Sequence, residues 1–463
     1  MLTDDHSPAG NQTPLIGGVV QHALRTREHG IPDDVSDAAR TLLLDAIGVG
    51  IAGSITDETA MARTVARSWG NDPQAPIWGS GEMLSAAHAA FVNAHQMHTL
   101  EWDAIHEPAV VHPMTVVTPV LLAWMARQAA AGERFSGKDL LRGIAVGVDV
   151  AAGLGDVTTT PLQFFRPATA GALGAVAAVG AASQLPGDRI AAALGIAYGG
   201  LSGTMQPHTE GAQVLALQVG FNARAALNAI DLAVAGFNGP RFILEGTYGY
   251  FRLIEAGGEP ERLIARLGSQ WEVQRTSLKP FPSGRATHGA LDGLQRLQAA
   301  HGFGIDDVEA VEIDVPPMVF GLVGRRPSPT MSIGASRLCL AYLVPNLLRD
   351  GTISLDTYRE DRVRNPEILA WSERVEIAPD GNPDPNAFDP QDVRVRLRDG
   401  SVLQVHVPAS LGSPSYPMTP EQVRAKFDEA MAAGGRGDRA DQVAVLVHHI
   451  EECQDASELW GLL

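Results

Sequence analysis

The sequence contains few cysteines, few aromatic residues and no excess of positive charge. Only two of its 463 residues are cysteines, Cys339 and Cys453, and no CxxC motif occurs. This count excludes a disulfide framework, a zinc site built from cysteines and a three-cysteine iron–sulfur cluster. So few cysteines are typical of a reducing compartment, and we expect a cytoplasmic protein.

Positive charge is scarce. The chain has 53 acidic and 35 basic residues, which gives a formal net charge of −18. Nucleic-acid binding requires a basic face that neutralises phosphates, so the charge argues against a nucleic-acid partner and also against an anionic membrane surface. A small anionic substrate is compatible with this charge if a local basic cluster receives it, because salt screens exposed charges beyond roughly 10 Å.

Long apolar runs are also lacking. The N-terminal stretch MLTDDHSPAGNQTP is polar and acidic, without the basic start and apolar run of a secretory signal. One of the longest apolar stretches, GALGAVAAVGAA (171–182), is too short and too rich in glycine to cross a bilayer. We therefore expect no membrane partner.

The residues that are present predict a large helical core. Apolar residues make up 45% of the chain and charged residues 19%, as in an ordinary globular protein, and the length favours two domains. Between about residues 15 and 270, apolar residues recur at intervals of three or four, which predicts helices. The clearest of these span 35–54 and 136–155, with Ser36 and Ser136 as N-cap candidates, and 167–185 and 219–236.

The pattern changes near Lys279. Residues 308–317 alternate between apolar and polar, as a half-buried strand does, and a helix is expected at 335–351. Residues 393–408 form two alternating runs around Asp399–Gly400, a dipeptide preferred in tight hairpin turns. After residue 412 the helical pattern returns, with Thr419 as N-cap and Pro420 as the first helical residue.

Together these patterns predict a mainly α protein with an α+β second domain. The large all-helical domain is discontinuous and comprises residues 1–274 and 412–463, and the smaller α+β lid domain comprises residues 275–411. A cleft between two such domains is a usual place for a small-molecule site.

The stretch EWDAIHEPAVVHP (101–113) concentrates acidic and imidazole groups, and NAHQMHTL adds two histidines just before it. A metal site is one interpretation. Its candidate ligands are His95, His98, Glu101 and His106. However, neither an HExxH nor an ExxH spacing occurs, so we expect no metal.

Two other interpretations of this stretch use no metal. In one, it is a helix end followed by a polar loop that stays irregular until a helix resumes near Val117. In the other, it is a proton-transfer site, because a carboxylate that holds a histidine orients the imidazole to act as acid or base. Asp103 or Glu101 would then orient His112 or His106.

The stretch SLKPFPSGRATHGALDGL (277–294) forms a basic cluster, with Lys279, Arg285 and His288 within ten residues. Lysine and arginine on such a turn can clamp carboxylates, and the helix that follows presents amide groups that favour anions. The alternative is a solvated basic loop. His208, in MQPHTEGAQ (205–213), is a further candidate for lining a site.

Five stretches, in this order along the chain, resemble the MmgE/PrpD family. They are residues 93–113, FFRPATAGALGA (164–175), GFNGPRFILEGTYGY (236–250), SLKPFPSGRATH (277–288) and GSPSYPMT (412–419). The resemblance runs from about residue 15 to 440 and implies the two-domain fold predicted above, in a homodimer. It also implies a reaction on a small polycarboxylate without metal or other cofactor. Members include 2-methylcitrate dehydratase, cis-aconitate decarboxylase and iminodisuccinate epimerase, and all move a proton at a carbon next to a carboxylate.

The resemblance implies roles for individual residues. By this resemblance we expect His112, Asp103, Lys279, His288 and Tyr342 to be the catalytic residues. The substrate-binding residues are Glu101, Arg166 and Arg285. His112 would transfer the proton, oriented by Asp103 or Glu101, and His288 or Tyr342 would serve the leaving hydroxyl group. The cations would hold carboxylates and stabilise developing enolate charge.

The chain also departs from the family pattern. Arg166 stands where many members have histidine, and Leu215 and Gln218 stand where the decarboxylase-like branch has lysine and histidine. Ala104 and Ile105 replace an acid and a threonine. These changes argue against cis-aconitate decarboxylase and predict a substrate with a different number of carboxylates or with an apolar substituent.

The sequence therefore predicts a cofactor-independent lyase, in particular a hydro-lyase of the 2-methylcitrate dehydratase type that acts on a small di- or tricarboxylic acid. An epimerase is the second candidate and a decarboxylase the third. A non-catalytic ligand-binding homologue is the alternative from another class.

Overall fold

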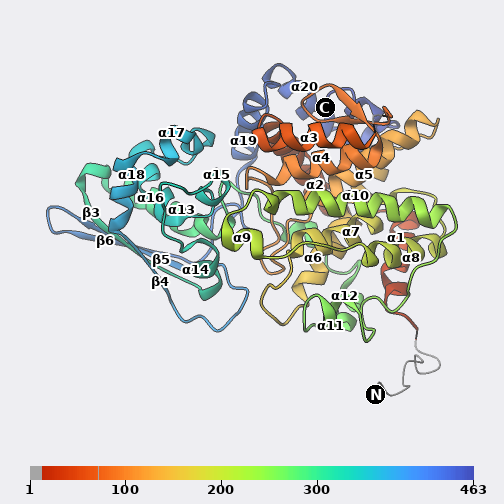
Figure 1. Ribbon diagram of the computed structural model, residues 1–463, viewed down its shortest axis with the longest axis horizontal. Coiled ribbons are helices and arrows are strands. Elements are labelled where there is room, and N and C mark those ends of the chain that lie inside the picture. Colours follow the sequence, from red (N-terminus) through yellow and green to blue (C-terminus); the bar gives the residue numbers. More distant parts are fainter. Residues whose placement is uncertain (1–12, 71) are drawn as a thin grey trace.

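The chain folds into a large helical lobe and a smaller lobe that contains a sheet (Figure 1). A computed structural model describes residues 13–70 and 72–463. The fold class predicted from the sequence, mainly α with an α+β second part, is confirmed.

The helical lobe consists of two sequence segments. The first carries α1 (Ile16–His29), α2 (Asp33–Gly53), α3 (Asp57–Trp69), α4 (Ala86–His98), α5 (Met114–Ala130), α6 (Gly137–Asp156), α7 (Arg166–Ala182), α8 (Gly187–Gly199), α9 (Gln206–Glu210), α10 (Val214–Val234), α11 (Tyr250–Leu253) and α12 (Pro260–Arg266). The second carries α19 (Pro420–Ala433) and α20 (Ala440–His448). The lobe is not purely helical, because β1 (Ala75–Ile77) and β2 (Glu82–Leu84) form a short antiparallel hairpin.

The centre of the helical lobe is α7, all of whose residues are buried. Small residues let α6 and α7 pack at close range: a Cβ atom on Gly174 would lie 2.5 Å from the carbonyl oxygen of Gly147. The helix α6 begins with the predicted cap, since Ser136 and Asp139 form a capping box. The predicted helix at 35–54 is confirmed as α2, but its predicted cap was wrong, because the helix begins at Asp33 and Ser36 lies buried inside it.

The sheet lobe carries four strands in the order β4-β3-β5-β6. Their bounds are β3 Val308–Val315, β4 Val375–Pro379, β5 Gln391–Leu397 and β6 Val402–Val407. The helices of this lobe are α13 (His288–His301), α14 (Pro317–Val323), α15 (Ile333–Ser336), α16 (Leu340–Asp350), α17 (Glu360–Val363) and α18 (Pro366–Trp371).

The predicted hairpin is confirmed, with Gly400 at φ +90° in the turn between β5 and β6. The helix α13 packs against these two strands, so one face of the sheet is buried (Figure 1). The other face carries cross-strand ion pairs, such as Arg394 with Asp314 at 2.6 Å.

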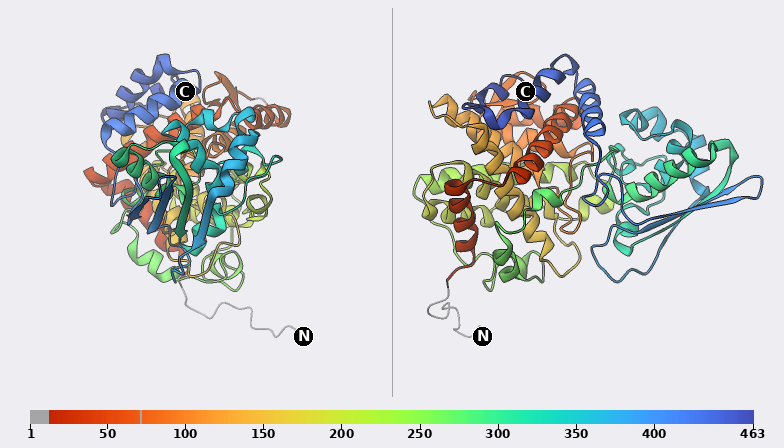
Figure 2. Two further views of the ribbon diagram at one scale, coloured as in Figure 1. Left: turned by 90° about the vertical axis from the view of Figure 1, so that its left-hand side faces the viewer. Right: turned by 180° about the vertical axis from the view of Figure 1, so that it is seen from behind.

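The C-terminal segment returns to the helical lobe, where α19 packs beside α2 (Figure 2). The predicted start is confirmed, because Thr419 forms a capping box ahead of Pro420. Lys426 on this helix pairs with buried Asp45 at 2.5 Å, and its ammonium also donates to the carbonyl oxygen of Trp102 at 2.9 Å. The C-terminal segment thereby holds the loop between α4 and α5 in place.

That loop, residues 99–113, contributes to both hydrophobic cores. Ala104, Ala109 and Val111 belong to the core of the helical lobe. Ile105 and Val110 belong to the core of the sheet lobe. The loop is therefore the segment at which the two lobes are packed together, and it ends where α5 begins, at Met114 rather than near Val117.

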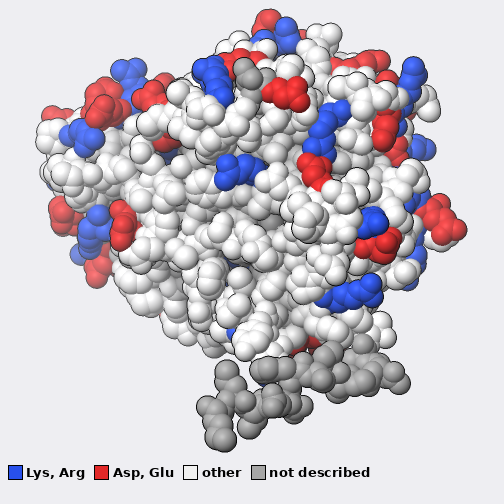
Figure 3. All heavy atoms as spheres, turned by 45° about the vertical axis from the view of Figure 1, so that its right-hand side comes forward, with Lys and Arg blue, Asp and Glu red and all other residues white. Residues whose placement is uncertain are grey.

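The surface has one broad face with few charges. Figure 3 brings forward the side on which α8 and α10 lie, and its centre carries few charged side chains. Leu232 and Val234 at the end of α10, and Phe237 just beyond it, are exposed. The homodimer remains a prediction.

Among the described residues no single helix has the length and apolarity to cross a membrane. The helices α2 and α3 meet both criteria only when they are taken together, and they form a pair bent by 88°.

The buried pair of Lys426 and Asp45 gives a stability prediction. Replacing Lys426 by methionine leaves the carboxylate of Asp45 buried without its cation, so the free energy of unfolding should fall by about 3 kcal/mol in urea titrations. Lys138→Met is the matched control, because Lys138 is exposed on α6. Equal stability of the two variants would contradict this account of the pair.

Candidate active site

The loop at residues 99–113 is the centre of the candidate site. It begins where α4 ends at His98 and closes with a short bridge between His106 and Val111. Its shape requires left-handed backbone at two non-glycine residues, Glu101 (φ 53°) and Val110 (φ 51°). Such conformations cost of order 1–3 kcal/mol, and for a β-branched valine they are rare. Both residues line the pocket described below, so this strain is concentrated at the site.

Two histidines share the carboxylate of Asp103. The Oδ2 atom of Asp103 lies 2.6 Å from Nδ1 of His112 and 3.1 Å from Nδ1 of His98, and the two imidazole rings meet edge to face at 4.7 Å. An ionised carboxylate only accepts hydrogen bonds, so both Nδ1 atoms donate to it. The Nε2 atom of His112 is left free to exchange a proton with a substrate.

A lysine from the start of the sheet lobe completes this cluster. The ammonium of Lys279 is fully buried and lies 3.2 Å from Oε2 of Glu101 and 3.8 Å from Oδ1 of Asp103. It also donates to the carbonyl oxygen of Glu101 at 3.0 Å. The sequence contains three lysines, and two of them, Lys279 and Lys426, anchor this loop.

The acids of the cluster are held in their ionised form. Burial alone would raise the pKa of Asp103, but His112, His98 and Lys279 outweigh it, and the pKa lies well below its usual range. Burial likewise opposes ionisation of Glu101, yet Lys279 and the two histidines lower its pKa.

The pKa values of the two histidines are shifted in opposite directions. Burial lowers the pKa of His112, and the charge of Lys279 adds to this, so that the pull of Asp103 is not enough to compensate. Burial also opposes protonation of His98, but Asp103 and Glu101 together outweigh it and raise the pKa of His98. These shifts favour the neutral form of His112, which can act as a base, and the cationic form of His98, which can act as an acid. Groups whose pKa values are pushed apart in this way are suited to acid and base roles.

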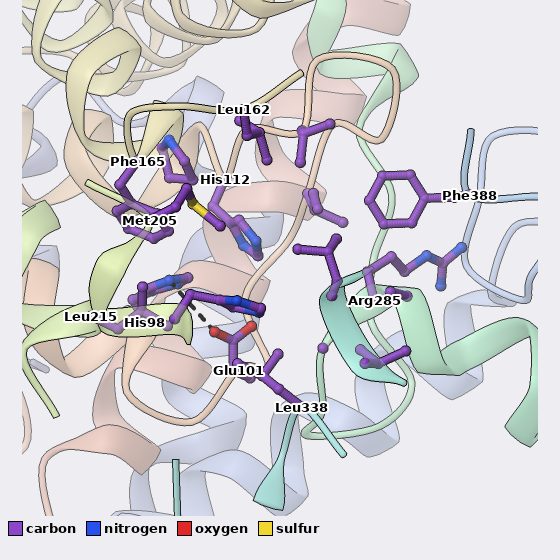
Figure 4. Close-up of a pocket in the computed structure, with 18 residues that line it drawn as sticks. His98, Glu101, His112, Leu162, Phe165, Met205, Leu215, Arg285, Leu338 and Phe388 are labelled. Atoms are coloured by element: carbon purple, nitrogen blue, oxygen red, sulfur yellow. Dashed lines mark ion pairs between the residues drawn. The ribbon is translucent and has the colours of Figure 1, made fainter. Parts of the chain in front are cut away.

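A pocket with a volume of about 70 Å³ opens beside these histidines. In Figure 4, His98, Glu101 and His112 lie together near Phe165 and Met205, while Arg285 and Phe388 lie across the pocket from them. Most of the lining is apolar. It includes Leu162, Phe165, Met205, Leu215, Leu338 and Phe388. His208 of α9 also lines it, and burial together with Arg325 lowers the pKa of His208 to about 4, so that this ring is neutral.

The predicted basic cluster is present, but its cations already have partners. Arg285 lines the pocket and pairs with Glu107 at 2.5 Å, while its other nitrogens donate to the carbonyl oxygens of Leu411 and Ser410. His288 lies behind Arg285, 3.2 Å from the hydroxyl of Ser283, and does not line the pocket. Burial and the charge of Arg285 lower the pKa of His288 well below its usual range.

Five of the predicted site residues lie outside the pocket lining: Asp103 and Lys279 stand behind the pocket in the charged cluster, His288 lies behind Arg285, and Arg166 and Tyr342 belong to neither group. Arg166 is fully buried, pairs with Glu255 at 2.9 Å and donates to the carbonyl oxygen of Ala109 at 2.7 Å. Its contacts support the loop at 99–113 from behind. The hydroxyl of Tyr342 donates to the carbonyl oxygen of Thr357 at 2.5 Å inside the sheet-lobe core. Neither side chain is positioned to touch a ligand in this pocket.

The histidines of the metal interpretation are not brought together. Nε2 of His106 lies 2.8 Å from Oε2 of Glu272, and the buried ring of His95 has no hydrogen-bond partner among the residues that the structure describes. Within the described residues, His98, Asp103 and His112 do offer ligand atoms within 4.8 Å of one another. In this cluster both Nδ1 atoms are turned to one carboxylate oxygen and Lys279 already supplies positive charge, which fits a hydrogen-bonded acid–base group.

Of the residues in this cluster, His112, Asp103, Glu101 and Lys279 were predicted from the sequence as site residues, whereas His98 was considered only as a metal ligand. The partnership of His98 with Asp103 depends on the turn after α4, which brings residues five apart into contact. The sequence offered one signal for this contact, which is a histidine in the last turn of a helix followed by two acidic residues. The apolar lining comes from both lobes and has no local motif.

Family models match both parts of the chain. The model for the MmgE/PrpD N-terminal domain matches residues 19–263, and the model for the MmgE/PrpD C-terminal domain matches residues 281–452. The chain is 26% identical to a cis-aconitate decarboxylase of Homo sapiens, over 96% of this chain and 94% of that protein. It is also 26% identical to a cis-aconitate decarboxylase of Aspergillus terreus, over 100% of this chain and 98% of that protein.

The opposite protonation of the two histidines can be measured directly. In histidine-labelled protein, NMR titration should give a midpoint above 6.5 for His98 and below 6.5 for His112. His98→Gln and His112→Gln assign the signals. Asp103→Asn should lower both pKa values, because it removes the negative charge that favours each imidazolium. Midpoints for both rings on the same side of 6.5 in the wild-type protein would contradict the assignment.

Proposed function

Because the chain belongs to the MmgE/PrpD family, we propose that it moves a proton at a carbon next to a carboxylate of a small polycarboxylic acid, with side chains as its only catalysts. The predicted lyase class is confirmed by relatives that are named decarboxylases. Within this class, we propose that the reaction is the dehydration of an acid of the 2-methylcitrate type.

The pairing of His98 and His112 on Asp103 is the observation that carries the proposal. Dehydration next to a carboxylate requires a base for the proton on carbon and an acid for the departing hydroxyl. His112 has a pKa below its ordinary value and a free Nε2, whereas His98 has a raised pKa. One carboxylate therefore orients both partners that the reaction requires.

The steps balance with these two groups. Nε2 of His112 takes the proton from the carbon next to a carboxylate, and the electron pair of that bond forms the double bond. The hydroxyl group on the neighbouring carbon leaves as water with a proton from His98. The charge of Lys279, 3.8 Å from Asp103, keeps that acid ionised throughout. Afterwards His112 is protonated and His98 neutral, and exchange with solvent restores both.

The apolar lining supports a substrate with an apolar substituent. Phe165, Met205 and Leu215 lie on the helical-lobe side, and Leu338 and Phe388 face them from the sheet lobe. A methyl or larger alkyl branch would bury apolar area there, worth roughly 0.8 kcal/mol for each buried CH₂ group. An acid built only of carboxylates and hydroxyls would leave this wall unused.

Decarboxylation is the second candidate, because relatives that align with nearly the whole chain bear that name. In that reaction carbon dioxide leaves and His98 or His112 protonates the carbon. Two polar residues expected for the decarboxylase-like branch are absent: Leu215 contributes to the apolar wall, and Gln218 hydrogen-bonds with Thr204. Epimerisation would need only proton removal and return.

One assay distinguishes dehydration, decarboxylation and epimerisation. The purified protein is incubated in heavy water with 2-methylcitrate, cis-aconitate and iminodisuccinate, and the products are followed by NMR. The proposal predicts an unsaturated acid from 2-methylcitrate. Carbon dioxide from cis-aconitate would mean decarboxylation, and deuterium uptake without a new product would mean epimerisation.

His112→Asn should lower kcat for the reactive acid by about 10²- to 10⁴-fold, because the base is lost. His301→Asn is the control, since His301 is exposed at the end of α13. Full turnover by His112→Asn would remove His112 from the mechanism. Binding of these acids without reaction or exchange would favour the non-catalytic homologue.

A further inference from the structure

A second cavity of about 50 Å³ adjoins the pocket at His98 and Glu101. The two cavities share five lining residues. These are His98, Glu101, His208, Leu215 and Leu338. The second cavity also has a wall from the sheet lobe, which includes Ser332 and Arg337. A water requires roughly 10–15 Å³ on this scale, so the cavity has room for a group of a few atoms.

Arg337 is the unusual residue of this cavity. It is 8% exposed, and no carboxylate of the described chain lies within 4.0 Å of its guanidinium. Its Nε atom is buried without a hydrogen-bond partner, and no other acceptor for its side chain is found among the described residues. The ring of Tyr358 lies 4.7 Å from the guanidinium carbon, and the carboxylates of Glu58 and Glu101 favour the charged form of Arg337 from beyond ion-pair distance. A buried cation in this state is costly unless something pairs with it.

The other cations around the two cavities have anionic partners. Lys279 pairs with Glu101, and Arg285 pairs with Glu107. Glu58, which also lines the second cavity, accepts a hydrogen bond from Gln213. Among the described residues that line either cavity, Arg337 is therefore the one cation without an anionic partner.

The backbone fixes Arg337 at this position. Its carbonyl oxygen accepts a hydrogen bond from the amide of Gly284 at 3.0 Å, which ties it to the segment of Arg285. A Cβ atom on Gly284 would lie 2.5 Å from Leu338, so the two segments pack closely. Arg337 and the histidines approach the shared wall from different lobes.

We propose that Arg337 binds a carboxylate of the substrate that lies away from the reacting carbon, and so selects acids with a further carboxylate. This inference rests on the proposed function for the position of the reacting carbon beside His112. A guanidinium accepts a carboxylate through two parallel hydrogen bonds, which fixes direction as well as position. A ligand that spans both cavities would pass His98 and Glu101 and reach His112.

The test measures binding rather than turnover. Calorimetry on the full chain compares propane-1,2,3-tricarboxylate with glutarate, which has one carboxylate fewer. The wild-type protein should prefer the tricarboxylate. Arg337→Gln should bind it about 10- to 100-fold more weakly and lose the preference, because charged hydrogen bonds are lost. Arg337→Lys, which keeps the charge but not the fork, should fall between the two.

Controls separate this role from a structural one. Arg364→Gln should bind like the wild type, because Arg364 pairs with Glu360 on the surface. Without ligand, Arg337→Gln should unfold at a temperature no lower than the wild type, since it loses an unpaired buried charge. Unchanged tricarboxylate affinity in Arg337→Gln, or no binding of either acid by the wild type, would overturn the proposal. A failure of the turnover assay alone would leave the binding result intact.

Discussion

The ionised carboxylate of Asp103 is the feature on which the site depends. A fully buried carboxylate is stable as an anion only when cations or hydrogen-bond donors surround it. Here two imidazoles and the ammonium of Lys279 do so. Because Lys279 comes from the start of the sheet lobe and the histidines from the helical lobe, the same charge also joins the two lobes at the site.

The loop that carries Asp103 is held by contacts on every side. Lys426 fixes Trp102 from the C-terminal segment, Arg166 fixes Ala109 from α7, and Lys279 fixes Glu101. In all three contacts the acceptor is a carbonyl oxygen of the loop. The contacts therefore fix the backbone of the loop directly and do not depend on its side chains. This explains how left-handed backbone at Glu101 and Val110 can persist. The energetic cost of this strained backbone is offset by buried ion pairs, which are formed by residues that lie far from the loop in the sequence.

Local patterns in the sequence predicted much of the fold. The caps at Ser136 and Thr419 and the hairpin at Gly400 each follow from neighbouring residues. The site was predicted in part. His112 and Asp103 were among the candidates of the proton-transfer interpretation, and the resemblance favoured them, but the partners of Arg285 and Arg166 are carboxylates 178 and 89 residues away. Whether a cation is free or already paired depends on such distant contacts, and no local motif reports it. Arg337, the one cation without an anionic partner among the described residues that line the two cavities, lies in a stretch (335–351) that was expected only to form a helix.

The proposed reaction requires one acid and one base that share a carboxylate, and the pH dependence of kcat/KM tests this requirement most directly. Protonation inactivates the base, so the rate should rise with pH through the pKa of His112, below 6.5. Loss of the proton inactivates the acid, so it should fall again through the pKa of His98, above 6.5. His98→Gln should lose the fall at high pH while the rise at low pH remains. A wild-type profile with no fall at high pH, or a fall that His98→Gln leaves unchanged, would contradict the account.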